Sequence, residues 1–157
     1  LFELNVMSGV RLTRHFLPGM LARDKGRVIF CGSETALRPS ADMMAYAASK
    51  TAQLGLARAF AERARATNVT VNTIMVGPTN TAGPRELHKR LAAESGKTIP
   101  EIQQDYIDTF VPHSLLGRMA EAEEVANFIV YLASDQATAT RGAILSAEGG
   151  VRQAIFV

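Results

Sequence analysis

The sequence has few of the features that mark secreted, membrane or nucleic-acid-binding proteins. It contains one cysteine, Cys31, which cannot form an internal disulfide and therefore favours a reducing cytoplasm. No apolar run approaches the roughly eighteen residues of a membrane-spanning helix, and the opening stretch LFELNVMSGVRLTRHF is too charged for a signal peptide. The net charge is +2 and the 17 basic residues are scattered, which argues against nucleic acid. The composition predicts a cytoplasmic protein with neither a membrane nor a nucleic-acid partner.

An initiating methionine is also missing, because the sequence starts at Leu1. A helical pattern is already under way at that point, and nothing before it would cap the helix or lead into it. We therefore expect the chain to be the carboxyl-terminal portion of a longer protein or of a longer ancestor. The 157 residues are enough for a single domain, residues 1–157, with a buried core.

Short apolar runs alternate with longer helical patterns along the chain. Three runs read as buried strands by their length, their branched side chains and their flanking glycines and prolines. They are residues 27–32, 68–78 and 142–150. Helical spacing of apolar residues predicts helices over 2–22, 44–66, 84–94, 100–110 and 121–135. Apolar strands separated by helices form parallel sheets covered on both faces, so we predict an α/β fold whose first strand has an open edge.

One cluster of polar residues has the composition of a proton-transfer site. Tyr46 and Lys50 are four residues apart and share a face of the second predicted helix. An isolated phenol has a pKa of about 10, and a neighbouring ammonium lowers it, which suits exchange of a proton with a hydroxyl or carbonyl. Ser33 follows the first strand, where active groups gather in parallel sheets. Each motif alone also fits an ordinary structural role, a half-buried ring with a solvated lysine and a turn serine.

In their order and spacing these motifs resemble the short-chain dehydrogenase/reductase family, from the first residue to the last strand. The family carries an asparagine in the helix before the serine strand, a serine thirteen residues before a tyrosine, and Tyr-x-x-x-Lys. This sequence has Asn5 in LFELNVMSG, Ser33 in VIFCGS, and Tyr46 and Lys50 in YAASK. VNTIMVGPTNT is similar to the family's nicotinamide loop, and LLGRMAEAEEVANFIVYLASD and GAILSAEGG resemble its closing helix and strand.

The resemblance implies a partial Rossmann-like parallel sheet of about three strands with flanking helices. It also implies reversible hydride transfer between NAD or NADP and a small-molecule alcohol or ketone. Tyr46 would give or take the proton, and Lys50 would lower its pKa and bind the nicotinamide ribose. Ser33 would orient the substrate oxygen, and Asn5 would anchor a water that relays protons.

The segment 77–81, which begins with Gly77, would lie against the nicotinamide. Thr79 would contact it mainly through its backbone, and Thr81 would contact it through its hydroxyl. Two positions depart from the family pattern: Val76 stands where a proline is usual, and Glu148 stands where an aspartate usually precedes the final Gly-Gly. Neither change removes a catalytic group.

The glycine-rich phosphate site of the family is missing. No Gly-x-x-x-Gly-x-Gly follows a predicted strand, and Asn-Asn-Ala-Gly does not occur. In dinucleotide-binding folds that first strand-to-helix turn holds the pyrophosphate at a helix amino end. The sequence thus predicts a catalytic half-site without the phosphate site, and little or no activity for this chain by itself.

Residues 79–116 resemble the family's substrate lid, and we expect an apolar face on its second helix. That face consists of Ile99, Ile102, Tyr106 and Phe110. Leu37, Met43 and Met44 either line a substrate pocket or fill gaps in the core.

No metal site is predicted, since the three histidines lack ligand spacing and read as surface or capping residues. They are His15, His88 and His113. Arg118 is expected to steady the loop before the last helix.

The second helix also carries small residues every three or four positions. They are Ala45, Ala48, Ala52, Gly55 and Ala59. The stripe either packs within the chain or pairs with a second copy, and the resemblance favours a homodimer or homotetramer. The alternative to an enzyme is a non-catalytic fragment that acts as an oligomerisation or interaction module.

Overall fold

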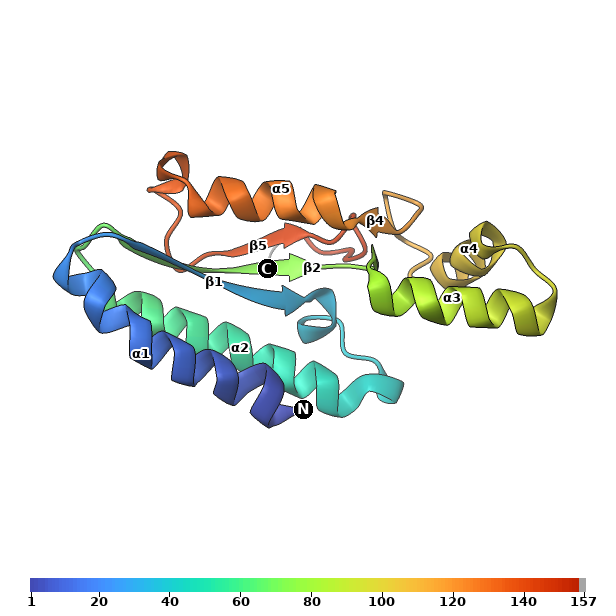
Figure 1. Ribbon diagram of the computed structural model, residues 1–157, viewed down its shortest axis with the longest axis horizontal. Helices are drawn as coiled ribbons and strands as arrows, with labels where there is room; N and C mark the ends of the chain where they lie inside the picture. The colour runs from blue at the N-terminus through green and yellow to red at the C-terminus, as the bar shows by residue number, and fades with distance from the viewer. Residues whose placement is uncertain (156–157) are drawn as a thin grey trace.

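The computed structural model describes residues 1–155 and contains the predicted parallel sheet. Its strands are β1 (Gly26–Ser33), β2 (Val69–Val76) and β5 (Ile144–Ala147), in the spatial order β1-β2-β5. The register sets Ser33 beside Val76 and Val76 beside Ala147, so all three strands end at the same edge (Figure 1). The α/β prediction is confirmed.

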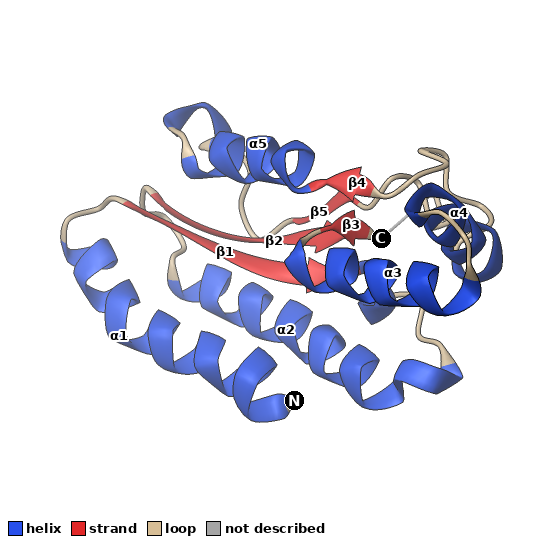
Figure 2. Cartoon of the chain, turned by 45° about the vertical axis from the view of Figure 1, so that its right-hand side comes forward, coloured by secondary structure: helices blue, strands red, loops and turns tan. Residues whose placement is uncertain are grey.

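Helices cover both faces of this sheet. The π-helical turn η1 (Glu3–Met7) leads into α1 (Ser8–Ala22), which lies beside α2 (Met44–Arg63) on one face. The opposite face carries α5 (Ala122–Ala133) (Figures 1 and 2). Among residues 1–155, no helix is both long enough and apolar enough to cross a bilayer.

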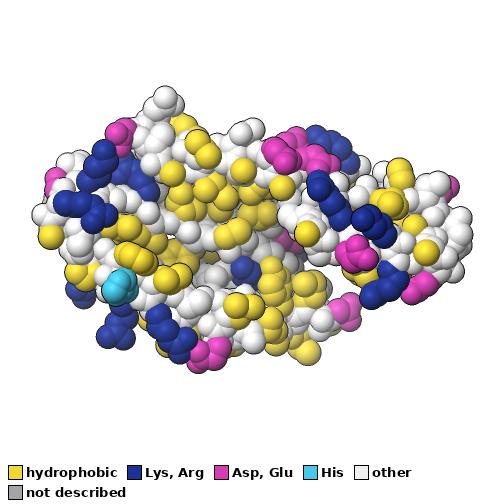
Figure 3. Space-filling view, in the orientation of Figure 1, with side chains coloured by type: hydrophobic (Ala, Val, Ile, Leu, Met, Phe, Trp, Pro, Cys, Tyr) yellow, Lys and Arg dark blue, Asp and Glu magenta, His cyan; other side chains and the backbone are white. Residues whose placement is uncertain are grey.

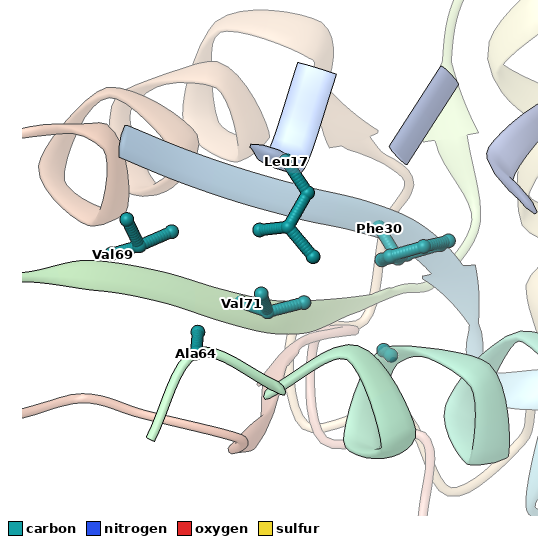
Figure 4. Close-up of a cluster of buried hydrophobic side chains, with 6 residues drawn as sticks. Leu17, Phe30, Ala64, Val69 and Val71 are labelled. Carbon is teal, nitrogen blue, oxygen red and sulfur yellow. The ribbon is translucent and has the colours of Figure 1, made fainter. Parts of the chain in front are cut away.

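The largest buried cluster joins α1 and α2 to the sheet. Leu17 of α1 packs on Phe30 of β1 and on Val69 and Val71 of β2, and Ala64 closes the far side (Figure 4). On the other face of β2, Ile74 contacts Val125 of α5. β2 is therefore buried on both sides, as expected for the central strand of a parallel sheet.

A smaller unit projects from the carboxyl ends of the strands. It contains α3 (Ala82–Ser95) and α4 (Ile99–Phe110), and it is tied to the body by β3 (Thr79–Asn80) paired with β4 (Ala120–Glu121) (Figure 2). Both helices were predicted, but two-residue strands leave no sequence pattern. Single 3-10 turns are η2 (Glu34–Ala36), η3 (Ala41–Met43) and η4 (Asp135–Ala137).

Three expectations about element bounds need correction. The first helix begins with a π turn rather than a regular α-helix, and the second ends at Arg63 because Ala66 adopts a positive φ of 59° in the following turn. The last strand stops at Ala147 because Gly149 and Gly150, with φ of 72° and 71°, turn the chain. Among the described residues the outer edge of β1 has no partner strand, as predicted.

Candidate active site

A cavity of about 910 Å³ opens at the carboxyl ends of β1 and β2 and runs beneath α3 and α4. It is bordered by the end of β1, the start of α2, the segment after β2 and the inner sides of the two projecting helices. Crevices at this end of a parallel sheet are where ligands bind in open α/β folds. The cavity is therefore the candidate site.

Three of the four predicted catalytic residues line this cavity. Ser33 is the last residue of β1, and Tyr46 and Lys50 lie one turn apart in the first part of α2. The Lys50 ammonium donates to the Cys31 carbonyl over 2.9 Å and lies 5.6 Å from the centre of the Tyr46 ring. The fold thus brings together residues that are thirteen and four positions apart in sequence.

The side chains of Tyr46 and Lys50 are both half-buried. Burial raises the pKa of the Tyr46 phenol and the charge of Glu34 raises it further, while a hydrogen bond with Ser33 lowers it. Burial lowers the pKa of Lys50. The sequence predicted a Tyr46 pKa lowered by Lys50, but the Lys50 ammonium donates to the Cys31 carbonyl, and the effect of burial on the Tyr46 pKa prevails.

The Ser33 hydroxyl belongs to a small network of side chains. Its oxygen lies 2.8 Å from Oε2 of Glu34 and 3.0 Å from Oγ1 of Thr35, and it accepts from the Thr35 amide at 3.3 Å. Ser33 is the N-cap of η2, which fixes its side chain against the end of β1. Glu34 also lines the cavity, and the sequence analysis did not single it out.

Asn5 lies outside the cavity wall. It sits in the π turn η1, where its side-chain amide donates to Oγ of Ser49 over 2.9 Å. The Asn5 carbonyl accepts a hydrogen bond from Nε2 of Gln53, so a buried glutamine of α2 bonds to the backbone of the π turn. Neither Ser49 nor Gln53 was recognised from the sequence, although the two are four residues apart and share a face of α2. A water-anchoring role for Asn5 stays a prediction.

The segment after β2 supplies the remaining predicted contacts. Gly77, Thr79 and Thr81 all line the cavity. Gly77 has a structural reason of its own, since a Cβ built there would stand 2.5 Å from the Glu148 carbonyl oxygen. The Thr79 hydroxyl donates to the Gly77 carbonyl over 2.9 Å, whereas the Thr81 side chain makes no hydrogen bond within residues 1–155.

The donors at this end of the cavity fit the nicotinamide half of a dinucleotide. The Lys50 ammonium has three N–H donors and uses one on Cys31, which leaves two for ribose hydroxyls. The Thr81 hydroxyl, which has no hydrogen-bond partner among residues 1–155, could bond to the carboxamide group of the nicotinamide. A glycine-rich turn for the pyrophosphate does not occur in the sequence.

Two expectations about the pocket wall are corrected. His88 is not a surface residue: it is 3% exposed, lines the cavity from α3, and its Nδ1 has no hydrogen-bond partner in the described chain. Of the three apolar candidates only Met43 lines the cavity, because Leu37 packs into a core cluster and Met44 is exposed.

The other two histidines lie at the surface and Arg118 ties a loop, as expected. His15 and His113 are both exposed. The described residues 1–155 contain no group of three or more His, Cys, Asp or Glu side chains arranged to hold a metal ion. Arg118 forms two 2.8 Å hydrogen bonds with the Glu124 carboxylate and a 3.0 Å bond with the Met119 carbonyl, which ties the loop to α5.

Comparison with known proteins agrees with this geometry. A family model described as enoyl-(acyl carrier protein) reductase matches residues 1–152. The oxidoreductases YvaG and YvrD of Bacillus subtilis, both named as uncharacterized, are 43% and 45% identical over 155 and 150 residues, which is 99% and 96% of this chain. The crystal structure of L-sorbose reductase from Gluconobacter frateurii, complexed with NADPH and L-sorbose, matches 98% of the chain with a TM-score of 0.90 and 32% identity.

The parallel sheet with helices on both faces is Rossmann-like. The chain belongs to the short-chain dehydrogenase/reductase family. It spans 59% of the length of YvaG, 57% of YvrD and 57% of the L-sorbose reductase chain.

Proposed function

We propose that the protein interconverts an alcohol and a ketone or aldehyde with NAD or NADP, and that Tyr46 is its acid/base. One observation carries the proposal: Ser33, Tyr46 and Lys50 converge on one cavity at the carboxyl ends of β1 and β2. A bound nicotinamide would supply or accept the hydride. The L-sorbose reductase structure, which contains NADPH and L-sorbose, supports this cofactor and substrate class.

The side chains divide the work by their chemistry. The raised pKa of Tyr46 keeps its phenol protonated at neutral pH, so it can donate to the oxygen of a ketone. On substrate binding the Ser33 hydroxyl would turn from the Glu34 carboxylate and donate to the same oxygen. The nearby Lys50 ammonium would bind ribose hydroxyls and stabilise phenolate once the proton has left. Asn5 would steady the proton path from behind α2.

Activity of the complete protein, whatever its total length, tests this function. A panel of alcohols and ketones is assayed with NAD, NADP and their reduced forms. Lys50→Met is expected to lower kcat/KM by about 10²-fold or more, because general acid–base catalysis contributes about 10²–10⁴-fold. Turnover that survives Lys50→Met at the wild-type rate contradicts the assignment.

The isolated 157-residue chain is expected to have little or no activity, since the pyrophosphate donors are not in its sequence. Robust NAD(P)H turnover by that chain contradicts this expectation. Residues 79–116 are proposed to be the substrate lid, as they carry α3 and α4 over the cavity.

We also propose that the protein forms a homodimer or homotetramer through α1 and α2. Four members of the small-residue stripe, Ala45, Ala48, Gly55 and Ala59, are exposed on α2. Large apolar side chains are exposed nearby: Leu4 of η1 is 74% exposed, and Leu12 and Phe16 of α1 are 59% and 53% exposed. Small residues allow a second helix to approach closely. Sedimentation of the complete protein and of Ala48→Glu tests this: the wild type should be oligomeric and the variant should dissociate, and a wild-type monomer rejects the interface.

A non-catalytic assembly module is the second candidate, favoured by the open edge of β1. Figure 3 shows hydrophobic side chains gathered between α5 and α1, where Figure 1 draws that strand. A complete protein that self-associates but transfers no hydride to any panel substrate would favour the module over the enzyme.

A further inference from the structure

Glu34 places a carboxylate next to the proposed reaction centre. It follows Ser33 directly, lines the cavity and is half-buried. Its Oε2 lies 2.8 Å from Oγ of Ser33, and its Oε1 lies 3.3 Å from Oγ1 of Thr35. A carboxylate offers roughly four acceptor positions, so two donors leave room for a third.

The other carboxylates of the cavity wall are neutralised by cations. Glu94 pairs with Arg90 at 3.9 Å, and Asp105 pairs with Lys97. Within residues 1–155 no lysine, arginine or histidine forms an ion pair with Glu34. Glu34 is thus the carboxylate of this wall that remains free to accept a hydrogen bond from a ligand.

We infer that Glu34 binds a second hydroxyl of the substrate, on the carbon next to the reacting one. The inference rests on the proposed oxidoreductase function. Ser33 and Glu34 hold their oxygens 2.8 Å apart, and oxygens on neighbouring carbons are likewise about a hydrogen-bond length apart. The substrates are therefore vicinal diols and the matching α-hydroxy ketones.

The charges of the cavity restrict this class to uncharged molecules. A carboxylate or phosphate beside the reacting carbon would be repelled by Glu34, and an ammonium there would meet Lys50 in the same cavity. A hydroxyl donates to Glu34 and carries no charge that Lys50 opposes.

The second hydroxyl is bound and is not changed by the reaction. In the oxidation direction the reacting C–H bond breaks, and its electron pair leaves as hydride to the oxidised nicotinamide cofactor. The proton of the hydroxyl on that same carbon leaves through Tyr46, and a C=O bond forms between this carbon and its oxygen. One diol and one oxidised cofactor give one hydroxy ketone, one reduced cofactor and one proton.

Two model alcohols that differ by one hydroxyl test the inference. The complete protein is assayed with cis-1,2-cyclohexanediol and with cyclohexanol, with NAD and with NADP. A charge-assisted hydrogen bond predicts that kcat/KM for the diol exceeds that for cyclohexanol by about 10-fold or more.

Substitutions of Glu34 locate the source of that preference. Glu34→Gln retains an acceptor for Ser33 but loses the charge, and should reduce the diol preference several-fold. Glu34→Leu removes the acceptor as well and should reduce the ratio of the two kcat/KM values to about one, with cyclohexanol as the internal reference for any change in the common chemistry. Glu86→Gln is the matched control, since Glu86 lies on α3, pairs with Lys89 and is outside the cavity wall; it should keep the wild-type preference.

The outcomes separate this inference from the proposed function. If the wild type oxidises neither compound, nor any other alcohol, the proposed function fails. If it oxidises both equally, or if Glu34→Gln and Glu34→Leu keep the preference, the inference about Glu34 is wrong and the oxidoreductase function stands. An equal loss on both compounds would make Glu34 a positioning residue for Ser33 and would also overturn the inference.

Discussion

Two regions of the chain border the cavity, and they differ in how firmly they are packed. β2 is buried over seven of its eight residues, with Val71 and Ile74 both 0% exposed. α3 buries only His88, and it exposes Leu87 and Leu91, which line the cavity. The proposed catalytic residues Ser33, Tyr46 and Lys50 are attached to the firm region, whereas the projecting helices contribute a mainly apolar wall. If the proposed function is right, the sheet and α2 fix the reacting groups, and α3 and α4 are the part of the wall that can adapt to a substrate.

The largest stability difference should separate these two regions. Ile74→Ala leaves a cavity in the core and should lower the free energy of unfolding by about 2–5 kcal/mol. Leu87→Ala removes a side chain that is 43% exposed and should cost less than about 1 kcal/mol. Chemical denaturation of the complete protein measures both. Equal losses would mean that the projecting helices are as firmly packed as the sheet.

A smaller loss of unfolding free energy is expected at Gly77, where the chain leaves β2 and enters segment 77–81. In Gly77→Ala the new methyl group would overlap the Glu148 backbone, so the turn must shift, at a cost of about 1–3 kcal/mol. Gly83→Ala is the control at the start of α3, where an added Cβ meets nothing within 4 Å. The control should keep or slightly raise the unfolding free energy. A harmless Gly77→Ala would show that the approach to Glu148 is not constrained.

The smallest change in stability is expected for the ion pair between Arg118, in the loop between α4 and α5, and Glu124 of α5. Arg118 holds the pKa of Glu124 at about 2, below its ordinary 4.5. Because the folded-state pKa is lowered, the stabilisation is present above pH 4.5 and is lost as the pH falls toward 2. Arg118→Met should remove this part of the acid sensitivity. Both side chains are exposed, so the difference between the two acid-unfolding curves should be small. Identical curves in low salt would show that the pair adds nothing.

The sheet and its flanking helices were predictable because their signals are local. Apolar runs such as VIFCG and helical periodicity such as that of residues 121–135 identify elements without knowledge of their neighbours. The same locality made Ser33, Tyr46 and Lys50 visible, since they sit at a strand end and one helical turn apart. Their joint role was inferred from the strand end, the helical spacing and the family resemblance, and the structure places all three on the wall of one cavity.

The remaining features depend on contacts between distant segments. The π turn around Asn5 is served by Gln53, 48 residues away, and a buried His88 needs the cavity wall to be recognised. The raised pKa of Tyr46 follows from burial, which the spacing to Lys50 does not report. Glu34 passed unnoticed because a glutamate after a strand usually lies in solvent. In each case the sequence did not show which distant segment packs against the residue, and therefore how deeply the residue is buried.

One pair of substitutions tests most directly whether the chemistry resides in the firm region. Tyr46 on α2 and Tyr106 on α4 are both half-buried phenols that line the cavity, and burial raises the pKa of each. In the complete protein, kcat is measured for Tyr46→Phe and Tyr106→Phe with the best substrate of the panel. Acid/base catalysis by Tyr46 predicts a loss of about 10²–10⁴-fold for Tyr46→Phe and a kcat within about threefold of wild type for Tyr106→Phe. Comparable losses in the two variants, or wild-type turnover by Tyr46→Phe, would contradict it.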